Sequence, residues 1–382
     1  MDGIIAFASS VVFVRSLQAF NKYLEVDRRY PSLMNNAVLP GDVKERLLNG
    51  YPTSSLYSIF DSNGYYQTIL GVLFRKISYK KAVTYDREFF RLKDGGQVGI
   101  DWRITESRHS RAPIVVIHHG LCGHSQSGYV KSMVRELEKA GFYVIVFVAR
   151  GCGRVPLTTP ETFTASRTSD MHQVLSRVRS VVGSEREIHA VGFSLGAGLL
   201  LKYLGEHGDN TVLKSAVAIC PSFDFLIKTE SFAMFSAGTV KSLQSLVKEH
   251  REYLEHHPDS KLDWKGMFAA RNIEQFDEAA IVGKDKVNYL HHPSVKDYYE
   301  KSSCIRYTRG CRVKTLAICA ADDPVCAISG APQDLSSVGP GLAVLKVAHG
   351  GHIGFGNRLL FPSRYWIDEA ACLFMKANSE TL

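Results

Sequence analysis

The sequence contains eight cysteines but no Cys-x-x-Cys pair, and several of the cysteines lie inside apolar runs typical of strands. This pattern disfavours a disulfide framework and a zinc site, both of which have recognisable cysteine spacings. We interpret the cysteines as buried free thiols of a protein that faces a reducing compartment. They are Cys122, Cys152, Cys220, Cys304, Cys311, Cys319, Cys326 and Cys372.

The sequence also lacks a long block of lysine and arginine, although its formal net charge is +8. A nucleic-acid-binding arm would need such a block, so we expect no nucleic-acid partner. The excess positive charge favours attraction to an anionic surface, for which membrane phosphate is the better candidate. The basic and aromatic run from Phe74 to Lys81 can lie against a membrane, although a solvated face is the more common explanation for such a run.

No apolar run near the N-terminus is long enough to cross a bilayer easily. The run Ile4–Val14 stops at Arg15 and would span about half of the roughly 30 Å of hydrocarbon. It has no basic residue ahead of it and no convincing cleavage site, so we expect no cleaved secretory signal. Two alternatives stay open, a helix continuing through Phe20 that anchors in the membrane and a helix that packs on the protein. We expect a membrane-associated or a cytoplasmic protein.

The sequence does contain alternating short apolar strands and amphipathic helices. Ile114–His118 and Tyr143–Val148 are continuous apolar runs, which are typical of strands buried on both faces of a parallel sheet. Residues 129–140 between them repeat apolar side chains at helical spacing, which predicts a βαβ unit. Further strands are expected at residues 187–191, 212–220, 315–320 and 343–347, and further helices at 168–182, 199–205 and 365–377.

These elements predict an α/β fold with a mostly parallel central sheet flanked by helices. An antiparallel hairpin is expected ahead of them, at residues 87–92 and 97–102. We assign residues 86–221 and 305–382 to this core. Residues 1–85 show no ladder of strands and form an expected N-terminal extension with a possible membrane-associating segment. Residues 222–304 carry helical patterns such as Val240–Leu254, and we interpret them as a mostly helical lid above the carboxyl edge of the sheet.

One expected strand-to-helix turn has the composition of a nucleophile elbow. In Gly192-Phe193-Ser194-Leu195-Gly196, the two glycines leave room for a turn sharp enough to expose the serine. A serine hydroxyl needs a histidine to take its proton and a carboxylate to orient that histidine. In this kind of fold the three residues follow in the order serine, acid, histidine.

Two later loops supply an acid and a histidine in that order. Asp322 and Asp323 follow one expected strand, and His349 and His352 follow the next. We favour Asp323 as the acid, because Asp322 is then free to accept hydrogen bonds from the N–H groups of the turn. We favour His352 as the base, because glycines flank it and permit close approach.

The oxyanion formed during acyl transfer also needs hydrogen-bond donors. His119 and Gly120 follow the strand Ile114–His118, in a loop similar to the one that supplies a backbone N–H in such enzymes. We expect the N–H groups of Leu121 and Leu195 to hold the oxyanion. Cys122 has no histidine and carboxylate placed for it, so we interpret it as pocket lining. This chemistry requires no cofactor and no metal, and we expect neither.

Together these motifs resemble the α/β-hydrolase group that includes the YheT-type esterases, the plant embryogenesis-associated proteins and animal proteins acting on phospholipids and monoacylglycerols. The resemblance covers roughly residues 51–374. It rests on Tyr51-Pro52-Thr53, Gln67-Thr68-Ile69, Asp94-Gly95-Gly96, Asp101-Trp102, His119-Gly120-Leu121, Tyr129-Val130, Arg150-Gly151-Cys152-Gly153, residues 156–160 and 192–196, Lys202-Tyr203-Leu204-Gly205, Phe276-Asp277-Glu278, Tyr298-Tyr299, residues 321–324 and Gly351-His352-Ile353-Gly354-Phe355.

The resemblance implies a triad of Ser194, Asp323 and His352, lipid or medium-chain ester substrates, and the N-terminal membrane anchor of many eukaryotic members. The chain departs from the group in its short leader and in Ala165-Ser166, where an Ala-Gly turn is common. Some relatives carry a His-x4-Asp motif of acyltransferases. Here Asn357 stands at that spacing from His352, and the match from His292 to Asp297 falls in the expected lid.

The sequence therefore predicts a serine esterase or lipase that cleaves acyl lipids through an acyl-enzyme on Ser194. Phospholipids, monoacylglycerols and medium-chain fatty acyl esters are the candidate substrates. The alternatives are an acyltransferase or ester synthase that uses the same triad, and a catalytically silent lipid-binding scaffold on the same fold. The expected partners are an acyl-lipid or small ester substrate and a membrane surface, and the oligomeric state is left open.

Overall fold

The computed structural model describes residues 31–51, 64–105, 111–229, 232–258, 260, 262–282, 292–356 and 364–382. The expected anchor or packing helix around Ile4–Val14 lies outside these ranges, as does Asn357. Among the described residues, the helices are too short or too polar for any of them to cross a membrane.

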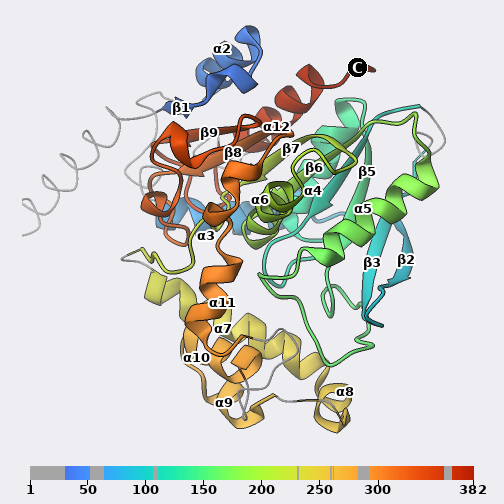
Figure 1. The fold of residues 1–382 in the computed structure, drawn as a ribbon, viewed down its shortest axis with the longest axis vertical. Coiled ribbons are helices and arrows are strands. Elements are labelled where there is room, and N and C mark those ends of the chain that lie inside the picture. The colour runs from blue at the N-terminus through green and yellow to red at the C-terminus, as the bar shows by residue number, and fades with distance from the viewer. Residues whose placement is uncertain are drawn as a thin grey trace, which may run out of the picture.

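A nine-stranded sheet forms the centre of the described part of the chain (Figure 1). Its order is β1-β9-β8-β7-β6-β4-β5-β3-β2, and the six strands from β4 to β9 run parallel to one another. The strands are β1 Ser32–Met34, β2 Tyr85–Arg91, β3 Gln97–Arg103, β4 Ile114–His118, β5 Tyr143–Val148, β6 Ile188–Phe193, β7 Leu213–Ile219, β8 Lys314–Ala320 and β9 Leu342–Val347. The predicted α/β fold with a mostly parallel sheet is confirmed.

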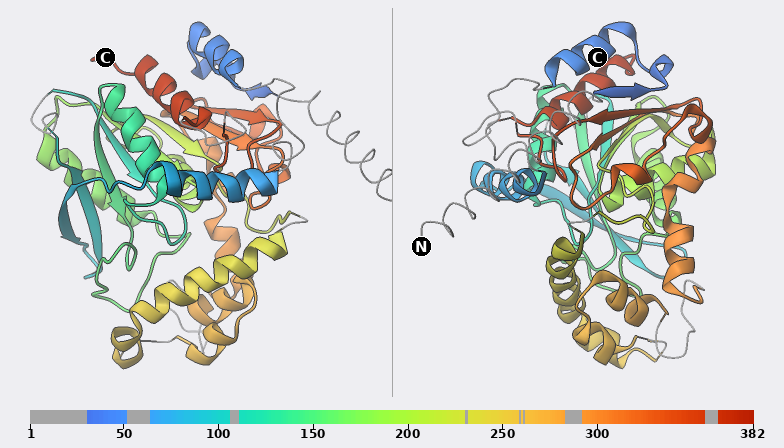
Figure 2. Two further views of the ribbon diagram at one scale, coloured as in Figure 1. Left: turned by 180° about the vertical axis from the view of Figure 1, so that it is seen from behind. Right: turned by 90° about the vertical axis from the view of Figure 1, so that its left-hand side faces the viewer.

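Helices cover both faces of the sheet, which explains the continuous apolar runs of its strands. In β4, Val115 and Ile117 pack in one core with helices α2 (Gly41–Gly50), α4 (Gly128–Lys139) and α12 (Trp366–Ala377). Ile114 and Val116 point the other way, into a second core with α5 (Ser169–Val182) and α6 (Leu195–His207). Both views of Figure 2 show α2 against α12 at one end of the molecule. Neither face of the central strands meets water, so neither needs polar side chains.

The expectation that residues 1–85 carry no strand is wrong at one point. β1 pairs antiparallel with β9 and forms an edge of the sheet, with Leu33 opposite Leu345. The side chain of Asn35, just after β1, donates a hydrogen bond to the carbonyl of Leu342 at 3.0 Å. Three residues are too few for a period-two pattern, and their partners lie about 310 positions away in the chain, so no local signal announces this strand.

The described part of residues 222–304 contains helices and no strand. They are α7 (Phe232–Glu249), α8 (Arg251–His256), α9 (Trp264–Ala269), α10 (Ile273–Asp277), a π-helical turn at Glu278–Val282 and α11 (Val295–Ser302). Figure 1 shows them grouped below the sheet. The single helix expected over Val240–Leu254 is divided at His250, whose Nε2–H donates to the carbonyl of Gly151 at 2.8 Å. These helices have an apolar core of their own, which includes Val240, Val247, Leu254, Met267 and Phe276.

Gly205 and Gly238 offer a matched test of the packing of α6. A Cβ at Gly205 would lie 2.1 Å from the carbonyl oxygen of Tyr307, whereas a Cβ at Gly238 in α7 would meet nothing within 4 Å. We expect Gly205→Ala to lower the free energy of unfolding by about 1–3 kcal/mol, because backbone must move. Gly238→Ala should raise it by about 0.5–1 kcal/mol, because alanine loses less backbone entropy in a helix. Urea unfolding measures both, and equal effects would contradict the described packing.

Candidate active site

Ser194 stands at the sharp turn between β6 and α6. Its backbone is at φ 52° and ψ −117°, a conformation that residues other than glycine adopt only under strain. A Cβ at Gly192 would lie 2.6 Å from the Cα of Ala197, and one at Gly196 would lie 2.3 Å from the carbonyl oxygen of His119. Strand, turn and helix can approach this closely only because both positions are glycine.

Hydrogen bonds connect Ser194, His352 and Asp323 in one chain. Nε2 of His352 lies 2.8 Å from Oγ of Ser194, and Nδ1 lies 2.9 Å from Oδ2 of Asp323. Oδ1 of Asp323 accepts hydrogen bonds from the N–H groups of Val325 and Cys326 at 2.8 and 2.9 Å. The carboxylate is buried. This arrangement orients the imidazole ring between a hydroxyl and a carboxylate.

The electrostatic environment favours the protonated form of His352. Burial by itself would lower the pKa of this histidine, but the neighbouring Asp323 carboxylate outweighs burial and raises the pKa well above its ordinary value of 6.5. The Asp323 carboxylate therefore stabilises the charged ring that forms when His352 takes a proton.

Helix α3 (Gly64–Ser78), from the expected N-terminal extension, holds the backbone of the histidine loop. Oγ1 of Thr68 accepts a hydrogen bond from the N–H of His352 at 2.8 Å, and Nη1 of Arg75 donates to the carbonyl of Ile353. No sequence pattern assigned these contacts. The only signal for them was that Thr68 belongs to one of the motifs shared with the hydrolase group.

Asp322 and His349, the alternatives considered for the acid and the base, contact each other instead. Oδ1 of Asp322 accepts a hydrogen bond from the N–H of Gly351 at 2.9 Å, and Oδ2 lies 3.5 Å from Nδ1 of His349. The hydroxyl of Tyr51 donates to the carbonyl of His349 at 2.9 Å and accepts from its N–H at 2.8 Å. The pair therefore braces the loop and makes no hydrogen bond to Ser194 within the described structure.

The N–H groups of Leu121 and Leu195 have no hydrogen-bond acceptor in the described part of the chain. Leu195 begins α6, and the first N–H groups of a helix have no partner inside it. The loop of Leu121 passes close to the serine, because a Cβ at Gly120 would lie 3.2 Å from the Cβ of Ser194. Both N–H groups are thus available near the exposed hydroxyl.

His119 supports this loop as a neutral side chain. Its Nδ1–H donates to the carbonyl of Gly120 at 2.7 Å, and its Nε2 accepts from the N–H of Ala149 at 3.1 Å. Burial lowers the pKa of His119 to about 4, which fits a ring that donates from one nitrogen and accepts at the other. The hydroxyl of Tyr129 holds the same loop by accepting from the N–H of Gly120 at 3.0 Å.

All eight cysteines are free thiols in the structure. Burial raises the pKa of Cys122 to about 12, so this residue is a neutral thiol and a poor nucleophile. Cys220, Asp323 and His352 are the one group of three possible metal ligands found among the described residues, with one atom each inside 4.8 Å. Burial also raises the pKa of Cys220 well above 9.0, and a protonated thiol binds metals weakly. The expectation of no metal stays a prediction.

A cavity of about 1980 Å³ reaches Ser194, His352 and Leu121. It extends between the core and the predicted lid segment, where five apolar side chains of α7 line it: Phe232, Phe235, Leu243, Leu246 and Val247. Typical small-molecule pockets have volumes of about 300–1,000 Å³, so this cavity has room for a larger ligand.

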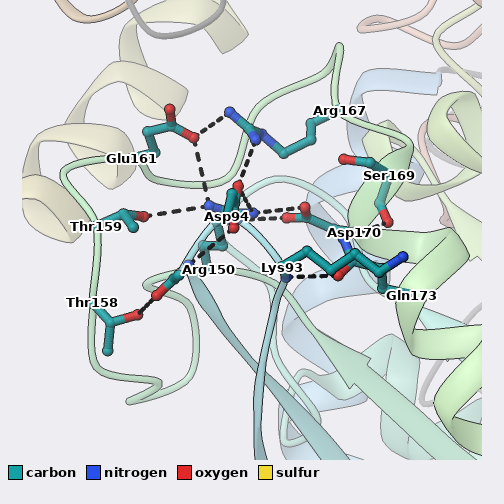
Figure 3. Close-up of polar contacts among 12 residues, drawn as sticks. Lys93, Asp94, Arg150, Thr158, Thr159, Glu161, Arg167, Ser169, Asp170 and Gln173 are labelled. Atoms are coloured by element: carbon teal, nitrogen blue, oxygen red, sulfur yellow. Dashed lines mark hydrogen bonds and ion pairs between the residues drawn. The ribbon is translucent and has the colours of Figure 1, made fainter.

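A buried arginine, Arg150, joins three segments of the chain (Figure 3). Nε and Nη2 of Arg150 donate to the two carboxyl oxygens of Asp170 at 2.6 and 2.8 Å, and Nη2 also donates to Asp94 at 2.7 Å. Arg167 joins Asp94 to Glu161 from the other side. The network ties the β2–β3 hairpin, the loop after β5 and the start of α5 together. The sequence analysis recorded Arg150 only as part of a motif.

The Arg150 network predicts a large difference between two conservative substitutions. Arg150→Lys cannot reproduce the two parallel hydrogen bonds to Asp170 and leaves a buried carboxylate without its full partner. We expect it to lower the free energy of unfolding by about 3 kcal/mol. The control is Arg177→Lys, which alters a partly exposed pair with Glu88 and should cost about 0.5 kcal/mol or less. Denaturant titration compares them, and a small loss for Arg150→Lys would contradict this account.

The chain matches known proteins over most of its length. The family model described as alpha/beta hydrolase fold matches residues 113–358. Embryogenesis-associated protein EMB8 of Picea glauca is 31% identical over 311 residues, covering 78% of this chain and 66% of that protein. Phospholipase ABHD3 of Bos taurus is 30% identical over 318 residues, covering 80% of this chain and 74% of that protein.

Two further similarities agree with this family. Medium-chain fatty acid ethyl ester synthase/esterase 2 of Saccharomyces cerevisiae is 29% identical over 331 residues, covering 80% of this chain and 71% of that protein. The solved structure of a hyperthermophilic esterase from the archaeon Pyrobaculum calidifontis superposes with a TM-score of 0.50 at 13% identity, covering 82% of this chain and 92% of that chain. At this low identity, the structure supports the fold alone.

The expected resemblance and the enzyme class, a carboxylic ester hydrolase, are confirmed by the family match and by relatives named as a phospholipase and an esterase. The chain belongs to the alpha/beta hydrolase fold family.

Proposed function

We propose that the protein is a serine hydrolase that cleaves carboxylic esters of acyl lipids through an acyl-enzyme on Ser194. The observation that carries this proposal is the hydrogen-bonded chain from Ser194 through His352 to Asp323. The unpaired N–H groups of Leu121 and Leu195 beside the serine support it further.

The proposed reaction begins with attack of the Ser194 hydroxyl on the ester carbonyl carbon, while Nε2 of His352 takes the hydroxyl proton. Asp323 stabilises the charged imidazole ring. The carbonyl oxygen becomes negative and accepts hydrogen bonds from Leu121 and Leu195. His352 then gives its proton to the departing alcohol, which leaves an acyl group on Ser194. His352 takes a proton from a water molecule, which attacks the acyl carbon. His352 then returns this proton to Oγ of Ser194 as the bond from Oγ to the acyl carbon breaks, and the fatty acid is released.

An acyl-lipid substrate is supported by the shape and lining of the cavity. The apolar side chains of α7 offer a dry surface to an acyl chain, and burial of each methylene group contributes about 0.8 kcal/mol. The similarity to a phospholipase of Bos taurus favours the same class of substrate.

The same acyl-enzyme can transfer its acyl group to an alcohol instead of water. The similarity to an ester synthase/esterase of Saccharomyces cerevisiae favours this second candidate function. Adding a short alcohol to the hydrolysis assay separates the two. A new ester in place of most of the free acid would identify a synthase, and unchanged release of free acid would identify a hydrolase.

Substitutions in the proposed triad should remove activity without unfolding the protein. We expect Ser194→Ala to lower kcat by a factor of about 10⁶ and to abolish labelling by a fluorophosphonate probe. Asp323→Asn should lower kcat about 10³–10⁴-fold, because the histidine loses its orientation and its counter-charge. Hydrolysis of p-nitrophenyl octanoate and probe labelling measure these effects.

Asp322→Asn is the matched control for Asp323→Asn, because Asp322 braces the same loop without contacting His352. We expect it to keep kcat within about tenfold of the wild type. Circular dichroism establishes that each variant is folded. Equal losses for the two asparagine variants, or labelling that survives in Ser194→Ala, would overturn the proposed assignment.

We also propose that α3 lies against an anionic membrane surface. Four of its apolar side chains are between 39% and 66% exposed: Ile69, Val72, Leu73 and Ile77. Lys76, Lys80 and Lys81 are exposed near its C-terminal end, and Val72 and Lys76 also line the cavity. Apolar side chains beside lysines fit the boundary between acyl chains and anionic head groups. A lipid could then reach the cavity from the surface that α3 contacts.

The membrane proposal predicts that Val72→Glu with Leu73→Glu reduces binding to phosphatidylcholine vesicles containing phosphatidylserine by tenfold or more. The change removes apolar area and adds negative charge at the proposed contact. Co-sedimentation measures binding. Phe89→Glu, at an exposed aromatic residue on β2 outside the cavity, is the control and should bind as the wild type does. Equal binding of all three proteins would exclude α3 as the contact.

A further inference from the structure

The predicted lid segment contributes a carboxyl group that the proposed mechanism does not use. Asp277 is the last residue of α10 and lines the cavity that reaches Ser194. Its neighbours in the lining are largely apolar, among them Phe276, Ala280 and Ile281. An acid in such a wall needs a polar partner, because an unpaired carboxyl group in an apolar site costs several kcal/mol.

One side of this carboxyl group is already occupied. The hydroxyl of Tyr299, from α11, donates a hydrogen bond to Oδ2 of Asp277 at 2.8 Å. Tyr299 is itself fixed, because it is buried and stacks on Phe225 with ring centroids 5.9 Å apart. The second oxygen, Oδ1, has no hydrogen-bond partner among the described residues. It also does not belong to the fully buried, unpaired polar atoms of those residues. The lid therefore presents one free carboxyl oxygen at a defined position on the cavity wall.

The Asp277 carboxyl group shares its cavity with the proposed reaction centre, because Asp277, Tyr299 and Ser194 all line it. Tyr299 belongs to the same apolar cluster as Leu195, and Leu121 packs against that cluster. The N–H groups of these two leucines are proposed to hold the oxyanion. A substrate bound there therefore occupies the same cavity as the Asp277 carboxyl group.

The charge of this carboxyl group suits a neutral polar ligand. Burial raises the pKa of Asp277 to about 7, with the Tyr299 hydrogen bond opposing the rise and Glu274 of the same helix adding to it. Both protonation states can bond a hydroxyl, the carboxylate as an acceptor and the acid as a donor. A cation would instead require the carboxylate form in an apolar wall, where ion pairs gain little net stability.

We infer that Asp277 and Tyr299 form a subsite that binds a hydroxyl group of the ester substrate, and that Asp277 is a specificity-determining residue. The hydroxyl can belong to the alcohol part of the ester or to its acyl chain. The inference rests on the proposed function, because it concerns the substrate of the same cavity. It gives the lid a chemical role beyond the apolar contacts of α7.

Three esters with the same carbon chain test the subsite by steady-state kinetics. Propyl octanoate has no hydroxyl, 1-octanoylglycerol carries hydroxyls on the alcohol, and propyl 8-hydroxyoctanoate carries one on the acyl chain. We expect Asp277→Ala to raise KM at least tenfold for one of the two hydroxyl esters, with kcat little changed, because the hydrogen bond between that hydroxyl and Asp277 is lost. KM for propyl octanoate should stay within about twofold. The hydroxyl ester that responds identifies the part of the substrate that is bound.

Two further variants separate recognition from damage to the lid. Tyr299→Phe keeps the packed ring but releases Asp277, so it should raise KM for the same ester by a smaller factor. Glu278→Ala removes the neighbouring exposed carboxylate, which does not line the cavity, and should change no KM. An equal change for all three esters in Asp277→Ala, or the same selectivity loss in Glu278→Ala, would overturn the subsite.

A binding measurement keeps the subsite independent of catalysis. The Ser194→Ala protein is titrated with 1-O-octylglycerol, with octyl propyl ether and with 8-propoxyoctan-1-ol, none of which contains an ester. We expect Asp277→Ala in this background to weaken one hydroxyl-bearing ether at least tenfold and octyl propyl ether not at all. If Asp277→Ala weakens no ether selectively while the wild type hydrolyses esters, the subsite alone is refuted. Selective binding by Ser194→Ala, together with a wild-type protein that hydrolyses none of the three esters, refutes the proposed function and leaves the subsite standing.

Discussion

The arrangement of the candidate site at the carboxyl edge of the sheet depends on one steric constraint. The turn at Ser194 leaves no space for a side chain at Gly192 or Gly196. The carbonyl oxygen of His119 occupies the position that a Cβ at Gly196 would need. The strained backbone of Ser194 costs about 1–3 kcal/mol, and its N–H is held by the carbonyl of Ile219 at 2.9 Å. Strand, helix and loop therefore touch here, and two residues next to the contact, Leu121 and Leu195, have N–H groups without an acceptor among the described residues.

The parallel register of β8 and β9 brings Asp323 and His352 to the same edge of the sheet as Ser194. Ala320 pairs with Val347 at the ends of these strands, so the loops that carry Asp323 and His352 begin at the same level of the sheet. Short loops then suffice to connect the carboxylate with the histidine. The Arg150 network holds the loop after β5, and other residues of that loop, such as Gly153 and Phe163, line the cavity.

Strands, helices and the order of serine, acid and histidine could be predicted from local patterns, because burial on both faces of the sheet leaves continuous apolar runs. Elements that depend on distant partners could not. β1 has only three residues and takes its place from β9. Thr68 is one of several polar residues in α3, and only the folded chain shows that it meets His352. The break at His250 likewise depends on the carbonyl of Gly151.

Helix α3 also changes what counts as the functional unit of this protein. By sequence it belongs to an extension ahead of the α/β core, yet it holds the backbone on both sides of the link between His352 and Ile353. A fragment beginning at residue 86 would retain the central parallel strands and Ser194 while leaving that N–H and that carbonyl without their partners. The α/β core therefore begins later in the chain than the residues that support the candidate active site.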